Sequence, residues 1–202
     1  MKVLVVTGGI GSGKSEVCRI LTELGVRGVY DADKRAKSLY EAVPGLLDAM
    51  ESELGLSLRD DDGRFVPAQL AAVVFADGKA LETVERLLFP VMLEDFNGWV
   101  QEYSADPLIV FESATILDKP FFKGFGDFVL LVDAPLELRR RRASLRDGVD
   151  EGLVQKRIDR QKAVNELSGM SVCPPEVDYI IVNDGGQENL REKVEKLMKI
   201  LI

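Results

Sequence analysis

The sequence contains no histidine, and it has only two cysteines, Cys18 and Cys173. Without histidine the chain cannot form a Ser-His or Cys-His nucleophile pair, and it cannot bind a metal ion through imidazole. The cysteines lie far apart and neither has a Cys-x-x-Cys partner, which argues against a disulfide framework and against a structural zinc site. This cysteine usage is typical of a reducing compartment, so we expect a cytoplasmic protein.

Long apolar segments and an excess of positive charge are also missing. No stretch is long enough to predict a transmembrane helix, and the first residues read at once as a strand, so we expect no membrane partner and no signal peptide. The formal net charge of −8 disfavours nucleic acid as a partner. With 202 residues, 46% of them hydrophobic, the chain can bury one full-sized core. We expect a monomer or a weak oligomer.

A phosphate-binding loop is predicted at residues 8–15, which read Gly-Gly-Ile-Gly-Ser-Gly-Lys-Ser and follow an apolar segment. Glycines let the backbone curl so that its N–H groups point at phosphate oxygens. Lys14 supplies a charge for the β- and γ-phosphates, and the Ser15 hydroxyl is suited to Mg²⁺. A helix predicted to begin at Ser15 directs its positive dipole end at the same anion. The strand, loop and helix together favour nucleotide binding over a glycine loop without function.

Five short segments rich in Val, Ile and Leu are predicted as strands: Lys2–Thr7, Gly28–Tyr30, Leu108–Phe111, Phe128–Val132 and Tyr179–Val182. They lack strict alternation of apolar and polar residues, as is typical of strands buried on both faces. Helical patterns separate them. This alternation predicts an α/β fold of three layers, in which a five-stranded parallel sheet lies between helices.

Two long helical stretches do not fit a minimal sheet. We expect a single domain whose core comprises residues 1–31, 107–135 and 176–202, with insertions at 32–106 and 136–172. The first insertion has a predicted turn at 59–63, and Pro90 is expected to kink or split its last helix. Both insertions follow strand ends, so we expect them at the carboxyl edge of the sheet, near the phosphate loop.

Polar residues follow four of the strands, and parallel strands bring such ends to one edge of a sheet. These residues are Asp31, Glu112, Asp133 and Asn183. For Asp133, which precedes Ala-Pro, the pattern favours a cap on the next helix. Asp31 and Asp33 together favour function, because one carboxylate can face a substrate hydroxyl while the other faces a metal ion or caps the backbone. Glu112 is the candidate for a carboxylate that supports a magnesium ion.

The segment from 135 to 162 is basic, with nine Lys or Arg against five Asp or Glu. Arg139, Arg142 and Arg146 fall on one face of a predicted helix. We interpret this segment as a lid whose arginines neutralise charge on a transferring phosphoryl group. The alternative is a solvated face on which Glu137 pairs with Arg141.

At this point the motifs resemble those of the dephospho-coenzyme A kinases. The shared segments are Thr-Gly-Gly-Ile-Gly-Ser-Gly-Lys-Ser at 7–15, Val-Tyr-Asp-Ala-Asp at 29–33, Phe-Glu-Ser-Ala at 111–114, Arg-x-x-x-Arg-Asp at 142–147, Arg-Ile-x-x-Gln at 157–161 and Asp-Tyr-Ile-Ile-Val-Asn-Asp-Gly at 178–185. They span nearly the whole chain in the same order. The resemblance implies a P-loop NTPase fold with a helical substrate lobe and a helical lid. It also implies Mg²⁺-dependent transfer of the ATP γ-phosphate to the ribose 3′-hydroxyl of dephospho-CoA.

The resemblance further implies roles for individual residues. Asp33 would be the catalytic base, with Lys14 and Arg142 as phosphate clamps, and Ser15 and Glu112 would serve the metal ion. The acceptor would contact Asp31, Asp33, Phe89, Pro90 and Glu112. ATP would contact Gly9, Ile10, Gly11, Ser12, Gly13, Lys14, Ser15, Glu16, Arg142, Arg146, Asn183 and Gly185, the last two within the adenine pocket.

Two positions depart from the family pattern. Phe89-Pro90 stands where the family usually has His-Pro, so an imidazole hydrogen bond is lost. Glu16 stands where a Thr or Ser often follows the loop; its N–H can still serve a phosphate, but its carboxylate must point away. Two other functions stay open: a kinase of the same fold for another small acceptor, such as a nucleoside or nucleotide, and a regulatory module that binds ATP without transferring phosphate.

Overall fold

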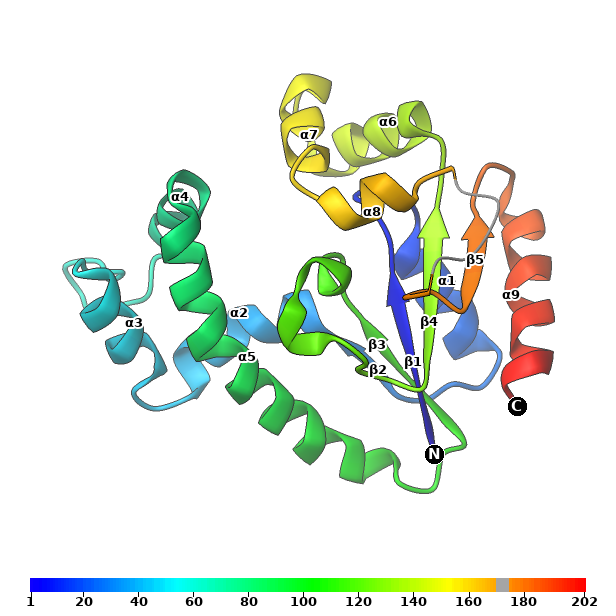
Figure 1. Ribbon diagram of the computed structural model, residues 1–202, viewed down its shortest axis with the longest axis horizontal. Helices are drawn as coiled ribbons and strands as arrows, with labels where there is room; N and C mark the ends of the chain where they lie inside the picture. The colour runs from blue at the N-terminus through cyan, green and yellow to red at the C-terminus, as the bar shows by residue number, and fades with distance from the viewer. Residues whose placement is uncertain (170–174) are drawn as a thin grey trace. The chain divides into compact units, whose positions relative to one another are not determined.

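A parallel five-stranded sheet forms the centre of the first of two structural units (Figure 1). The computed structural model describes residues 1–169 and 175–202; Cys173 and the predicted lid boundary at 172 lie outside them. The first unit comprises Met1–Asp31 and Tyr103–Ile202, and the second comprises Ala32–Glu102.

The sheet has the order β2-β3-β1-β4-β5, and every neighbouring pair is parallel. Its strands are β1 (Lys2–Thr7), β2 (Val29–Asp31), β3 (Leu108–Glu112), β4 (Phe128–Asp133) and β5 (Tyr179–Val182). All five predicted strands are confirmed. Three of them end one residue later than predicted, because Asp31, Glu112 and Asp133 still pair with the adjacent strand.

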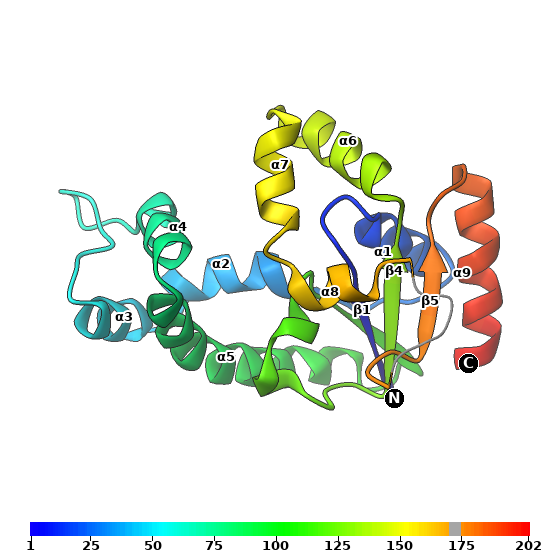
Figure 2. The same ribbon diagram turned by 45° about the horizontal axis from the view of Figure 1, so that its top comes forward.

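Helices cover both faces of the sheet, which confirms the three-layer α/β prediction. α1 (Lys14–Glu23) and α9 (Gln187–Leu201) lie side by side on one face (Figures 1 and 2). Their apolar residues form one core cluster with inward-facing residues of the strands, among them Leu4, Val6, Val17, Leu21, Leu190 and Val194. On the other face, Leu131 packs with Val164 of α8 (Lys162–Leu167) and with Val177. The two remaining α-helices of this unit, α6 (Leu136–Asp147) and α7 (Glu151–Ile158), form a helical pair after β4 (Figure 2).

The second unit contains α2 (Ala32–Ala42), α3 (Leu46–Leu54), α4 (Pro67–Ala76) and α5 (Gly78–Val100). The predicted turn is confirmed, since the Gly63 N–H donates to the Asp60 carbonyl over 2.9 Å. Pro90 lies inside α5, which is continuous, so the helix is not split there, and the other expected outcome, a kink, stays a prediction. The reason is packing: apolar residues at helical spacing on both sides of Pro90 are buried, and they hold both halves in one helix (Val84, Leu88, Met92, Phe96). In the described part of the chain, none of the helices has the length and apolar character needed to span a bilayer.

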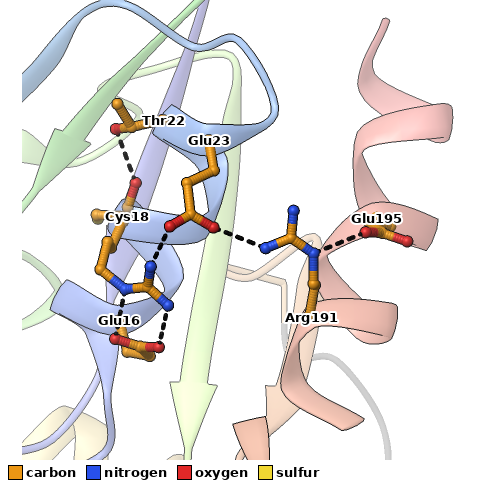
Figure 3. A network of polar contacts seen from close by, with 7 residues as sticks. Glu16, Cys18, Thr22, Glu23, Arg191 and Glu195 are labelled. Atoms are coloured by element: carbon orange, nitrogen blue, oxygen red, sulfur yellow. Dashed lines mark hydrogen bonds and ion pairs between the residues drawn. The ribbon is translucent and has the colours of Figure 1, made fainter. Parts of the chain in front are cut away.

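A chain of ion pairs fastens α1 to α9 (Figure 3). Arg19 lies between two carboxylates of its own helix, at 2.6 Å from Glu16 Oε1 and in contact with Glu23. Arg191 of α9 then joins Glu23 over 2.6 Å and Glu195 over 3.1 Å. Each exposed pair contributes little by itself, about 0.2–1 kcal/mol. The network nevertheless fixes the direction of the Glu16 carboxylate, which faces Arg19.

Candidate active site

The phosphate loop joins β1 to α1 and has the curled backbone that its glycines predict. Gly11 and Gly13 have φ values of 75° and 100°, in the left-handed region that favours glycine. The Ser12 N–H donates to the Gly9 carbonyl over 3.1 Å. Helix α1 begins at Lys14, one residue before the predicted start. Its first turn is closed by the Glu16 and Val17 N–H groups, which donate to the Gly13 carbonyl over 3.1 and 3.0 Å. The positive dipole end of α1 therefore lies at the loop, where it favours an anion.

Two side chains of the loop suit a bound polyphosphate. The Lys14 Nζ donates to the carbonyls of Gly8 at 3.0 Å and Gly9 at 3.4 Å, which holds its charge over the loop. Ser12 is fully buried, and its Oγ lacks a hydrogen-bond partner among the described residues. Buried hydroxyls are normally hydrogen-bonded, so this orphan inside the loop is consistent with a ligand that completes the site.

Three buried side chains from distant parts of the chain support this loop. The Asn183 side-chain amide, 7% exposed, donates to the Ser12 carbonyl over 2.9 Å. Arg139, 1% exposed, donates from Nε to the Ile10 carbonyl over 3.2 Å. Gln161, 4% exposed, accepts the Ile10 N–H over 2.7 Å. The contacts of Arg139 and Gln161 with the loop were not predicted. For Gln161, its place in the family motif at 157–161 could have indicated a role at the site.

Three of the five arginines of helix α6 were predicted to share one face, and they differ in burial and in partners. Arg139, which the sequence places on the same helix face as Arg142 and Arg146, is buried against the phosphate loop. The Arg142 guanidinium donates to the Asn183 carbonyl over 3.1 Å. Arg146 pairs with Asp147 at 2.8 Å.

The alternative pairing of Glu137 with Arg141 is also wrong. Glu137 pairs with Arg140 at 2.5 Å, because residues three apart meet on the same helix face. Arg140 also reaches Glu151 of α7 at 2.6 Å, which joins the two helices of the pair.

Ser15 and Glu112 meet at the carboxyl edge of the sheet. The Ser15 Oγ donates to Glu112 Oε1 over 3.0 Å, and Asp31 lies opposite Glu112 in the register of β2 and β3. Burial raises the pKa of Glu112, while the Ser15 hydrogen bond and the Lys14 charge oppose that rise. Burial, reinforced by the nearby Glu112 carboxylate, also raises the pKa of the Cys18 thiol.

These residues fit Mg²⁺ as a partner of bound phosphates. Across residues 1–169 and 175–202, no three or more His, Cys, Asp or Glu side chains gather as a metal site of their own. Magnesium in phosphoryl-transfer sites is commonly held by one or two protein oxygens with phosphate oxygens and water. A Ser15 hydroxyl that donates its proton to Glu112 keeps its lone pairs for a cation.

Asp133 does not cap the next helix, so that prediction is wrong. Pro135 is the N-cap of α6, and it makes no side-chain capping bond. The Asp133 carboxylate instead accepts the Ser168 hydroxyl at 2.7 Å and the Gly169 N–H at 2.8 Å. Because β4 continues through Asp133, its side chain is directed by the sheet and meets the end of α8.

The predicted residues of the acceptor site are divided between the two units. Asp31 ends β2 and Glu112 ends β3 in the first unit, whereas Asp33 lies in the first turn of α2. Phe89 and Pro90 belong to α5. Within the second unit, an ion pair of 2.7 Å between Arg35 and Asp95 joins α2 to α5. In the first unit, Gly185 is exposed after β5, next to the buried Asn183.

This combination of a phosphate loop after β1, a lysine over that loop and a parallel sheet in this order defines a P-loop NTPase fold. The family model for dephospho-CoA kinase matches residues 2–189. The chain therefore belongs to the dephospho-CoA kinase family.

Individual relatives agree with this assignment. The chain is 39% identical over 183 residues to a dephospho-CoA kinase of Porphyromonas gingivalis, and the aligned region covers 91% of this chain and 86% of that protein. The solved structure of TT1252 from Thermus thermophilus superposes with a TM-score of 0.80 at 28% identity, covering 100% of this chain and 98% of the other. A dephospho-CoA kinase from Campylobacter jejuni shares the fold, with a TM-score of 0.65 at 23% identity and coverage of 98% and 95%.

Proposed function

We propose that this protein transfers the γ-phosphate of ATP to the ribose 3′-hydroxyl of dephospho-CoA, giving CoA and ADP. The observation that carries the proposal is the phosphate loop at residues 8–15, built between β1 and α1 in a chain of the dephospho-CoA kinase family. Catalysis in such a site depends on positioning and on electrostatic stabilisation of the transferring group rather than on covalent chemistry by the protein.

The residues of the loop would bind the triphosphate. Loop N–H groups and the amino end of α1 would contact phosphate oxygens, and Lys14 would neutralise charge at the β- and γ-phosphates. When bound, Mg²⁺ polarises the phosphate oxygens and neutralises the charge that develops on them. Ser15 would hold this ion directly, and Glu112 would orient the Ser15 hydroxyl through the hydrogen bond between them. The backbone of Gly9 to Glu16 completes the proposed ATP contacts.

The acceptor would bind to the helical lobe at 32–106, with Asp33 as general base. A carboxylate within hydrogen-bond reach of the 3′-hydroxyl can accept its proton as the new O–P bond forms. Asp31, Phe89, Pro90 and Glu112 would line the acceptor side of the site. Phe89 offers apolar contact in place of an imidazole hydrogen bond.

The segment 136–172 would act as a lid over the phosphates. Arg142 and Arg146 would contact the transferring phosphoryl group, since a guanidinium binds phosphate oxygens through two parallel hydrogen bonds. Asn183 and Gly185 would border the adenine. We further propose that the protein acts in the cytoplasm as a monomer or weak oligomer, without nucleic acid or membrane partners.

The test is a coupled assay of ADP release with Mg²⁺-ATP and dephospho-CoA, compared with the same mixture without an acceptor. AMP, adenosine and shikimate serve as competing acceptors. We expect ADP release that requires dephospho-CoA. Faster release with another acceptor would assign a different kinase, and stabilisation by ATP with no product from any acceptor would assign a binding module.

A further inference from the structure

The backbone N–H and the backbone carbonyl of Ile10, which belong to the two peptide groups on either side of its Cα, are both held by side chains from outside the phosphate loop. The Ile10 N–H donates to the Gln161 side-chain carbonyl over 2.7 Å. The Ile10 carbonyl accepts from Arg139 Nε over 3.2 Å. Both side chains are almost fully buried, so water does not compete for these bonds. The two contacts restrain the two successive peptide planes that meet at the Ile10 Cα, in the middle of the loop.

The loop also packs directly on Arg139. A Cβ atom on Gly9 would lie 1.8 Å from a guanidinium nitrogen of Arg139, and one on Gly11 would lie 2.1 Å from the Arg139 carbonyl oxygen. Both separations are far inside van der Waals contact. The glycines on either side of Ile10 are therefore required by this packing as well as by the curl of the loop.

We call Arg139 and Gln161 together the Ile10 clamp. Their other polar atoms connect the clamp to the rest of the site. The Gln161 side-chain amide donates to the Ala114 carbonyl over 3.1 Å, two residues beyond Glu112. Arg139 donates to Asn165 Oδ1 over 3.4 Å, and the Asn165 amide donates to the Ile158 carbonyl over 2.6 Å. The middle of the loop is thus tied to the strand end whose carboxylate binds Ser15.

The charge of Arg139 lacks a directly bonded counter-charge. Its hydrogen-bond acceptors in the described part of the chain are the neutral Ile10 carbonyl and the Asn165 amide. Burial lowers the pKa of the guanidinium, and the nearby Asp133 carboxylate opposes that fall. A buried cation without an ion pair is costly to the fold, and an anion in the loop would offset this cost. The loop is where the proposed function places the triphosphate.

We propose that Arg139 and Gln161 are positioning residues for the nucleotide. Together they hold the two peptide groups on either side of the Ile10 Cα so that the loop keeps its phosphate-binding shape, and Arg139 places a buried positive charge against the loop in which the phosphates would bind. The inference rests on the proposed function in that ATP is taken as the nucleotide. Because both side chains bond to the backbone of the loop, they would act on the nucleotide through the loop.

The test uses Gln161→Met and Arg139→Met, which keep similar volume and remove the polar contacts. Matched controls are Gln155→Met and Arg140→Met, because both wild-type side chains bind exposed carboxylates. Gln155 donates to Asp159 at the end of α7, and Arg140 pairs with Glu137 of α6 and Glu151 of α7. Calorimetry gives the Kd for ATP, steady-state assays give KM for each substrate, and urea unfolding followed by circular dichroism identifies folded variants.

We expect Kd and KM for ATP to rise about tenfold or more in Gln161→Met and Arg139→Met, as for loss of a buried hydrogen bond. The KM for dephospho-CoA should stay within about twofold, and both controls should bind ATP like the wild type. In Arg139→Met the loss should be larger for ATP than for ADP, because the charge acts on the extra phosphate.

Folded Gln161→Met that binds ATP as tightly as the wild type would overturn the inference, and so would an equal rise in KM for both substrates. If Arg139→Met lacks a cooperative unfolding transition, Gln161→Met decides alone. A wild type that binds ATP and does not phosphorylate dephospho-CoA would refute the proposed reaction. The Kd values for ATP would still test whether Arg139 and Gln161 position the nucleotide.

Discussion

Replacing Gly13 with alanine should damage the protein more than the same change at Gly25, although both glycines flank α1. Their φ values are nearly equal, 100° and 103°, so left-handed strain is shared at roughly 1–2 kcal/mol. Their surroundings differ. A Cβ on Gly13 would lie 2.2 Å from the Asn183 side-chain nitrogen, whereas nothing lies within 4 Å of one on Gly25. Displacing Asn183 breaks its buried bond to the Ser12 carbonyl, which adds about 1–3 kcal/mol.

We therefore expect the free energy of unfolding to fall by about 2–5 kcal/mol in Gly13→Ala and by about 1–2 kcal/mol in Gly25→Ala. Urea unfolding followed by far-ultraviolet circular dichroism measures both. In an Asn183→Ala background the penalty of Gly13→Ala should shrink to that of Gly25→Ala, because the clash is gone. Equal penalties for the two glycines in the wild type, or no coupling between Gly13 and Asn183, would refute the reasoning.

Three further predictions concern catalysis, metal binding and pH. Asp33→Asn should keep ATP binding by calorimetry and lose turnover by at least about a hundredfold in the coupled assay; near-normal turnover would remove Asp33 from the role of base. Ser15→Ala should raise the Mg²⁺ concentration for half-maximal activity by about tenfold, and an unchanged Mg²⁺ titration would contradict the metal contact. Hydrogen bonding and charge from Arg146 lower the pKa of Asp147 in the folded protein below its ordinary value of 3.8. The ionised Asp147 side chain therefore stabilises the fold above pH 3.8, and this stabilisation is lost as the pH falls through the lower pKa of the folded state. Asp147→Asn should therefore have a lower Tm than the wild type at pH 7, and this gap should shrink as the pH falls below 3.8; a gap that does not change with pH would contradict this.

The strands could be predicted because their apolar residues are contiguous and the sheet buries both faces. β1 and β5 match the prediction at both ends. The last residues of β2, β3 and β4 are acidic, so composition alone ends those strands one residue too early. Pro90 shows the opposite limit: local chemistry predicts a break, and buried apolar residues on both sides override it.

The phosphate loop could be predicted because its chemistry lies within eight consecutive residues. Its supports could not, since they come from residues far along the chain: Gln161 is 151 positions from its partner Ile10, and Arg139 is 129 positions from it. Arginine is rarely fully buried, so nothing in the run of four arginines at 139–142 indicated that Arg139 packs against the loop. Asn183 was correctly placed near the loop by the rule for strand ends, but its hydrogen bond to the Ser12 carbonyl needs the folded geometry.

The dependence of the loop on Asn183 has a consequence for protein synthesis. The ribosome makes the loop first, yet the side chain that supports Ser12 arrives 171 positions later. Until β5 and α9 have emerged, the nascent sheet ends at β4, and the apolar side of α1 lacks Leu190 and Val194 as packing partners. An unfinished chain thus carries the complete nucleotide motif before the Asn183 contact to Ser12 can form.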